Sequence, residues 1–543
     1  MSNSFVQALQ SWTRLLGAVH VVGAPDQLAA ASMTTFATGQ RVQAIILPGD
    51  RAEVQESVRI ANQFGVPVYP ISSGRNWGYG SRVPARDGVL IDLRRLNRIL
   101  AFDEDLAYVT VEPGVTQRQL HEFLRARNSR LWMDATGASP DCSIIGNTLE
   151  RGFGHTPMGD HAGHACGLEV VLPGGDVIET GFGRFPASAV TALHQSGVGP
   201  SLDGLFIQSN LGIVTRMSVW LMPAPERFEA FFFLSRRDDG LDSIVDALRP
   251  LRMDGTLRSV MHIGNDYKVL AGSSQFPWDE TGGRTPLGRD VMTRIRRRLG
   301  IGAWNGSGGL YGTRPQVREA KRRLGRALKG KVDRLLFVDD RRLGLLTRFA
   351  GPARWLTGLD VKGTVTVLSP VYQLLKGVPT EAPMASTYWR KRTPIPLRPD
   401  PDRDGCGLLW CSPLVPNTGR HIAEATRLAE AILLQHGFEP QVSVSLATSR
   451  SAICVIAISY DRSVPGEDAR ALKCYRHLAE TLIDRGYPPY RLNVGGMDLT
   501  GTDGAYAATL QAIRRALDPR GILAPGRYEP AAQTAAERQT GVA

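Results

Sequence analysis

A strand–helix–strand pattern that runs directly into a glycine-rich loop most constrains how this chain can fold. Residues 44–47 are apolar and predict a buried strand, and Asp50 with Glu53 predicts a capped start for the helix that follows. Residues 66–71 predict the second strand, so the segment predicts a βαβ unit. The loop 72–80 then places three glycines within seven residues, which allows backbone N–H groups to approach a phosphate closely.

Two further glycine-rich stretches, at 137–163 and 209–214, lie downstream of that loop. Three such loops favour an extended cofactor with a pyrophosphate, although taken alone they are equally compatible with ordinary turns. The third glycine of a nicotinamide fingerprint and the lysine of a P-loop are missing, so neither a nicotinamide-dependent Rossmann enzyme nor an ATPase is expected. Residues 168–172 and 176–179 predict a β-hairpin, and residues 205–222 predict two strands that flank a turn.

Composition and charge narrow the class of protein. The 543 residues are 43% hydrophobic and 21% charged, as in globular proteins, and no apolar run is long enough to span a membrane. The formal net charge of +12 includes two basic clusters, at 294–298 and 321–326, whose helical spacing predicts solvated helix faces and no nucleic-acid partner. The N-terminus lacks a secretory signal and the six cysteines lack zinc spacing, so we expect a cytoplasmic protein with reduced thiols and no metal.

The sequence predicts an α+β fold organised in two domains. Its composition shifts after Pro225, and from there to about residue 480 strand-like runs alternate with basic amphipathic helices. We therefore expect one domain at 1–225, a second α+β domain at 226–480, and a C-terminal segment at 481–543. The Ala-, Gln- and Thr-rich tail after residue 530 predicts disorder.

Five motifs occur in order along the chain: SGRNWGYG at 73–80, GNTLERGFGHTPMGDH at 146–161, DGLFIQSNLGIVT at 203–215, PYR at 489–491 and DPRGILAPGRY at 518–528. In sequence and spacing they resemble the vanillyl-alcohol oxidase and p-cresol methylhydroxylase family of flavoproteins, over nearly the whole chain. The resemblance implies a two-part FAD-binding domain (p-cresol-methylhydroxylase type), formed by 1–225 and the segment from 481 onward. The intervening 226–480 is then an inserted substrate-binding cap. A homo-oligomer is also implied.

The resemblance further implies oxidation of a para-substituted phenol, such as a 4-alkylphenol or a 4-hydroxybenzyl alcohol. The family binds this substrate as a phenolate with two tyrosines and one arginine, which match Tyr79, Tyr490 and Arg491. A fixed cation and two hydroxyl donors lower the pKa of a bound phenol. Hydride transfer from the para-benzylic carbon to flavin N5 then gives a p-quinone methide, which adds water, or a benzylic alcohol goes on to the carbonyl. The expected electron acceptor is O2 or a cytochrome, which the basic helices could dock.

The residues that the resemblance implies for FAD binding lie in the same motifs. They are Ser73, Gly74, Arg75, Asn76, Gly78, Cys142, Ile145, Gly146, Asn147, Gly152, Gly154, Asn210, Gly212, Ile213, Val214 and Arg527. Backbone groups of 73–80 and 209–214 are expected to hold the pyrophosphate, with Arg527 near the flavin.

Four positions depart from the family pattern. Leu408 stands where the oxidase branch has the histidine that links FAD covalently, so we expect non-covalent FAD. Cys142 matches the cysteine that the berberine-bridge-like branch joins to flavin C6, which leaves a 6-S-cysteinyl link as an alternative. The catalytic aspartate of the oxidase branch has no direct counterpart, and Asp141 is the nearest substitute. His155 replaces an active-site tyrosine and is a candidate acid or base.

Two other functions remain open on the sequence alone. One is a berberine-bridge-like FAD oxidase of an alcohol or amine, with Cys142 linked to FAD. The other is a flavin-binding partner subunit without turnover. The retained glycine loops and the two tyrosines with their arginine favour phenol oxidation over both.

Overall fold

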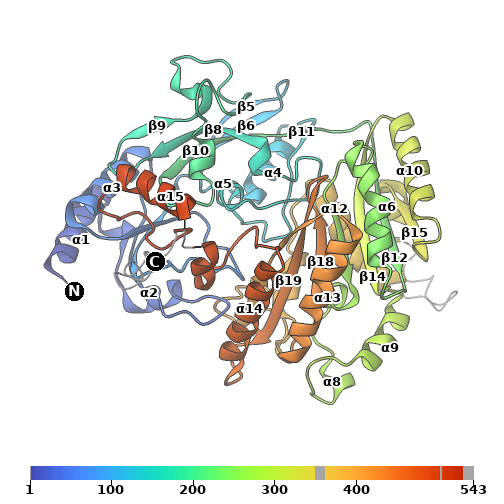
Figure 1. Cartoon of the computed structure of the whole chain (residues 1–543). Helices are drawn as coiled ribbons and strands as arrows, with labels where there is room; N and C mark the ends of the chain where they lie inside the picture. The colour runs from blue at the N-terminus through green and yellow to red at the C-terminus, as the bar shows by residue number, and fades with distance from the viewer. Residues whose placement is uncertain (1, 346, 349–360, 502–503, 530–543) are drawn as a thin grey trace.

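The computed structural model describes residues 2–345, 347–348, 361–501 and 504–529, which form three large sheets and a two-stranded ribbon (Figure 1). The first two sheets use strands between residues 21 and 220, and the third uses strands between 227 and 461. The predicted α+β class is confirmed. The tail after residue 530, for which disorder is predicted, lies outside the described residues.

The first sheet is mixed, with strand order β1-β2-β4-β3. Its strands are β1 (Val21–Val22), β2 (Val42–Ile46), β3 (Val68–Ile71) and β4 (Gly88–Asp92). β2 and β3 both run parallel to β4, so the predicted βαβ unit is present with a third strand inserted. Its helix, α3 (Arg51–Phe64), begins where predicted because the Asp50 carboxylate accepts a hydrogen bond from the Glu53 N–H. α1 (Asn3–Leu16) packs on α3, and α2 (Pro25–Ala31) lies against β2.

The second sheet is antiparallel, with strand order β5-β6-β10-β8-β9. Its strands are β5 (Ile99–Asp103), β6 (Tyr108–Val111), β8 (Ala165–Val171), β9 (Val177–Glu179) and β10 (Ile213–Trp220). β8 and β9 form the predicted hairpin. The predicted strand from residue 205 is wrong, because Asp203–Phe206 forms a 3-10 helix that buries Phe206 without a strand partner. α4 (Gln117–Ala126) and α5 (Ile144–Leu149) pack on this sheet, and β7 (Leu131–Trp132) pairs with β11 (Met222–Pro223).

The third sheet is antiparallel and has the order β15-β12-β14-β13-β18-β19-β16, with β17 paired to β19. Its strands are β12 (Arg227–Ser235), β13 (Met261–Asn265), β14 (Trp304–Gly312), β15 (Arg334–Val338), β16 (Cys406–Cys411), β17 (Leu414–Pro416), β18 (Gln441–Leu446) and β19 (Ser451–Asp461). One face builds a large apolar core with four helices, α6 (Leu241–Met253), α10 (Arg314–Leu328), α13 (Gly419–Gln435) and α14 (Glu467–Asp484). In Figure 1, α6 and α10 lie at the end of the molecule away from α1 and α3.

The remaining helices connect these layers. They are α7 (Asp266–Ala271), α8 (Trp278–Thr281), α9 (Arg289–Leu299), α12 (Val361–Leu375) and α15 (Gly504–Leu517). After α15 the chain returns to the first sheet, where Leu523 forms a parallel bridge with Val68 and the Tyr69 hydroxyl donates to the Pro525 carbonyl at 2.7 Å. The two ends of the described chain therefore meet in one apolar core.

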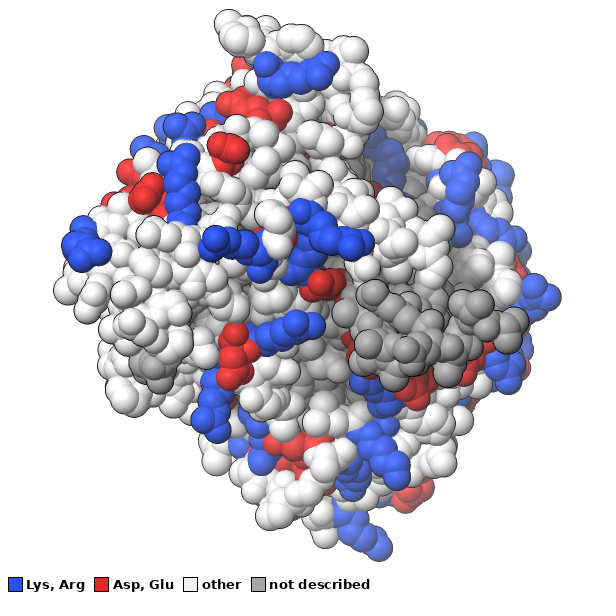
Figure 2. All heavy atoms as spheres, turned by 60° about the vertical axis from the view of Figure 1, so that its left-hand side comes forward, with Lys and Arg blue, Asp and Glu red and all other residues white. Residues whose placement is uncertain are grey.

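On the face of the molecule that Figure 2 shows, basic and acidic side chains are interspersed. Members of both basic clusters pair with acids of the third sheet region: Arg296 with Asp266 at 2.5 Å, and Lys321 with Glu229 at 2.6 Å. Among the described residues, no helix is both long enough and apolar enough to cross a membrane.

Candidate active site

The loop between β3 and β4 presents a run of free backbone donors. Within the described part of the chain, no backbone N–H group of residues 73–77 donates a hydrogen bond. Gly74 and Gly78 have φ of 65° and 78°, left-handed conformations of the kind that shape anion-binding concavities. The loop lines a cleft of about 230 Å³ together with two arginines and three aspartates: Arg82, Arg94, Asp141, Asp400 and Asp402. Five consecutive free amides beside guanidinium groups suit a pyrophosphate, so FAD fits here with its pyrophosphate on this loop.

Gly78 is a tight position in this loop, and it gives a first prediction. A Cβ at Gly78 would overlap the indole ring of Trp410 on β16. We expect Gly78→Ala to weaken FAD binding at least ~10-fold, because the loop must shift and a left-handed alanine is strained. Fluorescence titration of the apoprotein with FAD measures this. Gly204→Ala, where a Cβ meets nothing within 4 Å, is the control. Equal affinity of Gly78→Ala and wild type for FAD would contradict the binding of the pyrophosphate by this loop.

The other residues expected at FAD lie partly beside this loop and partly in the core. Ser73 Oγ accepts the Ser143 N–H at 3.2 Å, which joins the loop to the start of α5, the helix that carries Ile145, Gly146 and Asn147. Gly152 and Gly154 leave room for the side chains of Asn147 and Asp134. Ile145, Ile213 and Val214 are at most 3% exposed and belong to the apolar core. Asn210 donates to the Ala524 carbonyl at 3.4 Å, and Gly212 packs closely on Val170 and Phe206.

The three residues predicted to bind a phenolate lie together. The guanidinium carbon of Arg491 is 4.2 Å from the centroid of the Tyr79 ring, and the Tyr79 hydroxyl is 2.9 Å from Ser412 Oγ. Tyr490 lies beside Tyr79, and its N–H donates to the Ser412 carbonyl at 3.0 Å. Burial, reinforced by Tyr490, raises the pKa of Tyr79 well above its usual value, so this hydroxyl keeps its proton at neutral pH.

Glu150 is the counter-ion of the arginines, and sequence reasoning missed it. Its Oε2 accepts hydrogen bonds from Arg491 Nε at 3.2 Å and from the Tyr528 hydroxyl at 2.9 Å, while Oε1 contacts Arg527 Nη2. Arg491 also donates to Asn76 Oδ1 at 2.6 Å and is 8% exposed. A buried guanidinium needs such acceptors. Glu150 belongs to the LERGFG motif, but no spacing in the sequence connects it to Arg491.

Two histidines face each other next to the tyrosines. The ring centroids of His155 and His262 are 4.3 Å apart, and the Phe153 ring lies 6.1 Å from His262 and 6.0 Å from Tyr490. Burial lowers the pKa of both histidines, and His155 lowers that of His262 further. His155 Nδ1 lies 3.0 Å from the Ala135 carbonyl, which can only accept a hydrogen bond. Nδ1 therefore carries the proton, and Nε2 is the nitrogen that can take one up.

Asp134 organises the segment that carries His155. Its Oδ1 accepts hydrogen bonds from the N–H groups of His155 and Thr156, at 3.2 and 2.6 Å. Its Oδ2 lies 2.6 Å from His161 Nε2, and His161 Nδ1 lies 2.6 Å from Asn147 Oδ1. Burial alone would raise the pKa of Asp134, but His161 and Thr156 outweigh it, so the pKa lies below its usual value. His161 thus links the segment to α5.

Asp141, the predicted substitute for a catalytic aspartate, lies in a different place. It pairs with Arg118 at 2.8 Å and with Arg75 at 3.5 Å, in the cleft that the loop 72–80 lines. Its side chain is 38% exposed. This position does not support a role beside the histidines. The buried carboxylate there is Asp134, which stands seven positions earlier in the same loop.

The two histidines predict an acid-sensitive fold. The unfolded chain takes up protons at these residues below about pH 6.5, whereas the folded chain resists protonation until its lower pKa values are reached. Stability is therefore retained above about pH 6.5 and lost as the pH falls through the folded pKa values. We expect the midpoint temperature of thermal unfolding to decrease as the pH is lowered from 7 to 5. The decrease should be smaller in the double variant His155→Gln, His262→Gln. A double variant as acid-sensitive as wild type would contradict this assignment.

Comparison with known proteins identifies the family of this chain. Residues 42–181 match the family model of an FAD binding domain. The chain is 45% identical over 526 residues to 1'-carboxy-chondrochloren decarboxylase of Chondromyces crocatus. The match covers 96% of this chain and 97% of that protein. It is 32% identical over 532 residues to the flavoprotein subunit of 4-cresol dehydrogenase (hydroxylating) of Pseudomonas putida. This match covers 96% of this chain and 95% of that protein.

Solved structures give the same result. The fold matches p-cresol methylhydroxylase with substrate bound at a TM-score of 0.86 and 30% identity, over 97% of each chain. It matches the 4-ethylphenol oxidase of Gulosibacter chungangensis, in its isoeugenol complex, at a TM-score of 0.87 and 28% identity, over 98% of each chain. The chain therefore belongs to the vanillyl-alcohol oxidase and p-cresol methylhydroxylase family of FAD-dependent oxidoreductases.

Proposed function

We propose that this enzyme oxidises a para-substituted phenol, which it binds as the phenolate. The observation that carries the proposal is the meeting of Tyr79, Tyr490 and Arg491 beside Ser412. A guanidinium and two protonated hydroxyls can surround one phenolate oxygen, and they favour its charged form. We assign residues 1–225 and 481–543 to FAD binding and residues 226–480 to the cap.

When bound, FAD supplies a hydride acceptor for the para-benzylic carbon. Phenolate formation raises the electron density at that carbon, and loss of the hydride leaves the substrate as a p-quinone methide. The chain's task is then to orient the ring and exclude bulk water. The electron acceptor that returns FAD to its oxidised form is O2 or a cytochrome, and we expect a homo-oligomer.

The p-quinone methide can add water at its benzylic carbon. His155 suits this step, because its ring is neutral at pH 7 and Nε2 can accept a proton from the attacking water. The benzylic carbon gains a hydroxyl group, and the ring regains its phenolate. The product is a 4-hydroxybenzyl-type alcohol.

Decarboxylation is a second candidate outcome, favoured by the relative that is 45% identical and named a decarboxylase. It requires a substrate with a carboxylate on the carbon next to the benzylic one. After hydride loss, the bond to the carboxylate breaks and CO2 leaves. The electron pair of that bond forms a C=C bond and restores the phenolate. The only oxidant required is the hydride acceptor.

Product analysis with two substrates tests these proposals. 4-Ethylphenol tests oxidation, and 3-(4-hydroxyphenyl)propanoate tests the fate of a carboxylate. We expect oxidised product from 4-ethylphenol, and 4-vinylphenol with an equal amount of CO2 from the acid. A hydroxylated acid without CO2 would leave phenol oxidation standing and reject decarboxylation. If neither compound is consumed by FAD-loaded enzyme, phenol oxidation itself is rejected.

Attachment of FAD gives a further prediction. Burial raises the pKa of the Cys142 thiol to about 11, although Arg491 and Arg75 act in the other direction. Such a thiol stays protonated at neutral pH and is a poor nucleophile. Leu408 has no atom that could bond to FAD. We therefore expect acid precipitation to leave all yellow colour in the supernatant, whereas colour in the pellet that disappears in Cys142→Ser would establish the berberine-bridge-like link.

A further inference from the structure

Lys268, on α7, is a cation without a counter-ion. Within the described part of the chain, its ammonium group has no ion pair or hydrogen bond, and its Nζ lies 4.6 Å from the centroid of the Trp410 ring. Burial alone lowers its pKa to about 8. Taking an ammonium group out of water is costly unless a partner supplies the opposite charge. A lysine kept in this state indicates a ligand that brings a negative charge.

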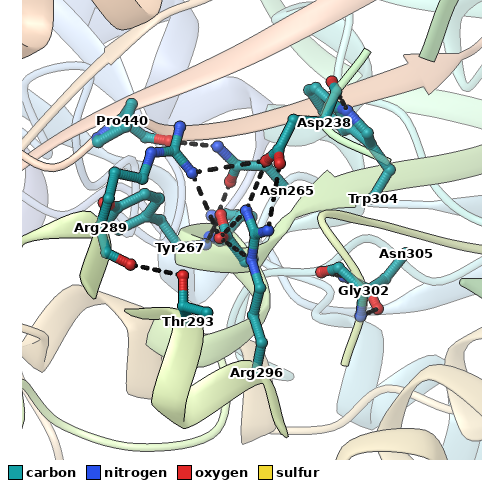
Figure 3. A network of polar contacts seen from close by, with 12 residues as sticks. Asp238, Asn265, Tyr267, Arg289, Thr293, Arg296, Gly302, Trp304, Asn305 and Pro440 are labelled. Carbon is teal, nitrogen blue, oxygen red and sulfur yellow. Dashed lines mark hydrogen bonds and ion pairs between the residues drawn. The ribbon is translucent and has the colours of Figure 1, made fainter. Parts of the chain in front are cut away.

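The neighbouring carboxylates do not compensate Lys268, because they are held by other groups. Asp266, two residues earlier on α7, pairs with Arg296 at 2.5 Å and with Arg289 at 3.5 Å. Figure 3 shows Arg289 and Arg296 converging on this network, where Arg296 also pairs with Asp238 at 2.7 Å. The acids nearest in sequence to Lys268 are therefore already neutralised.

The same network holds α7 in place. Asn265 Oδ1 accepts the Lys268 N–H at 3.0 Å and caps the helix, while Asn265 Nδ2 donates to the Pro440 carbonyl at 2.5 Å (Figure 3). The Tyr267 hydroxyl donates to the Leu287 carbonyl at 3.0 Å. The backbone that carries Lys268 is thus fixed on both sides, so its side chain is presented in advance of any ligand.

Lys268 stands over the same sheet face that carries the candidate active site. Paired residues of antiparallel strands share a face, and the registers place Gly264, Ser443 and Val455 side by side on β13, β18 and β19. The Lys268 side chain passes over Gly264, with Cγ 3.5 Å from where a Cβ would stand. His262 is two residues from Gly264 on the same face, and Ser412, the partner of Tyr79, directly follows β16 at the far side.

This face carries Gly264, Ser443 and Val455 together with the Trp410 ring of β16, and it has two polar ends. Three strand spacings, or about 14 Å, separate β13 from β16. At the β16 end lie Ser412, Tyr79 and the guanidinium of Arg491, and from the β13 end the Lys268 side chain extends its ammonium group to the Trp410 ring. A phenol whose oxygen is held at the first end directs its para substituent toward the second.

We infer that Lys268 binds a carboxylate carried by the para substituent, so that the site selects acidic phenols over neutral ones. This inference rests on the proposed phenol binding and names the substrate class. The pairing satisfies both charges in a place where water competes little, which makes a charge-assisted hydrogen bond strong.

Two isosteric ligands test this inference, 3-(4-hydroxyphenyl)propanoate and its primary amide. We expect wild-type enzyme to prefer the acid in kcat/KM, and Lys268→Met to lower the acid-to-amide ratio about 100-fold, as removal of one partner of a buried charge pair does. Lys268→Arg should recover part of the preference. Lys473→Met, an exposed lysine on α14, is the matched control and should keep the wild-type ratio. Flavin content and thermal midpoint, measured on each variant, detect misfolding.

Titration calorimetry measures the affinity for both ligands even if the enzyme turns over neither of them. Tighter binding of the acid that is lost in Lys268→Met supports the inference, with or without catalysis. Equal affinity for acid and amide in wild type overturns it, as does an acid preference that survives in Lys268→Met. Turnover of the amide together with either of these results would leave phenol oxidation intact.

Discussion

Replacing Arg491 with methionine is expected to lower kcat/KM for 4-alkylphenols by about three orders of magnitude while FAD content stays close to that of wild type. Arg491 is the cation at the proposed phenolate site, and losing one partner of a buried charge pair costs roughly 3–5 kcal/mol, or about 10² to 4 × 10³ in rate. Glu150 remains paired with Arg527 in this variant, so no carboxylate is left without a cation. Steady-state kinetics on FAD-loaded protein measures the effect.

The pH profile separates this role from a structural one. Without Arg491 the substrate must ionise with less help, so the rate should rise toward higher pH, following the pKa of the free phenol. Arg485→Met, at an exposed position where Arg485 pairs with Glu424, is the matched control and should leave rate and profile unchanged. A full rate in Arg491→Met, with an unchanged profile, would remove Arg491 from substrate binding.

Asp134→Asn is expected to lower the free energy of unfolding by about 3 kcal/mol and to reduce turnover at the same time. The change keeps the shape of the side chain but places an amide opposite His161 Nε2 and removes the charge that this buried contact uses. Asp134 also fixes the N–H groups of His155 and Thr156, so His155, the proposed base, should lose its position. Thermal unfolding and kcat measured on the same preparation test both effects.

Asp105→Asn provides the comparison for Asp134. Asp105 is an exposed carboxylate in the turn between β5 and β6, where the same substitution should change the midpoint little. If Asp134→Asn were as stable and as active as Asp105→Asn, Asp134 would not organise the site.

Local sequence signals predict α3 and the glycine-rich loop, whereas only the family resemblance connects Tyr79, Tyr490 and Arg491. Asp50 fixes the start of α3, and the glycines of 72–80 follow directly on β3. Residues brought in from the third sheet gave no such signal. His262 and Lys268 reach the site only through strand pairing and helix anchoring, and no short motif contains either of them.

The errors have the same physical origin. Short apolar segments look alike whether a sheet or a 3-10 turn buries them, so the sequence predicts a strand from residue 205 where the chain forms a 3-10 helix. Asp141 and Asp134 lie in one loop, and only the folded chain shows that Asp141 turns to Arg118 while Asp134 turns inward to His161. The sequence alone does not show which of these two carboxylates lies beside the histidines.

Anaerobic addition of 4-ethylphenol to the FAD-loaded enzyme tests the central claim most directly. If the tyrosines and Arg491 hold a phenolate for hydride transfer, the visible flavin band bleaches in wild type and bleaches far more slowly in the double variant Tyr490→Phe, Arg491→Met. Both proteins should contain FAD before the addition. A yellow wild-type enzyme whose band stays unchanged with 4-ethylphenol and with 3-(4-hydroxyphenyl)propanoate would contradict the claim.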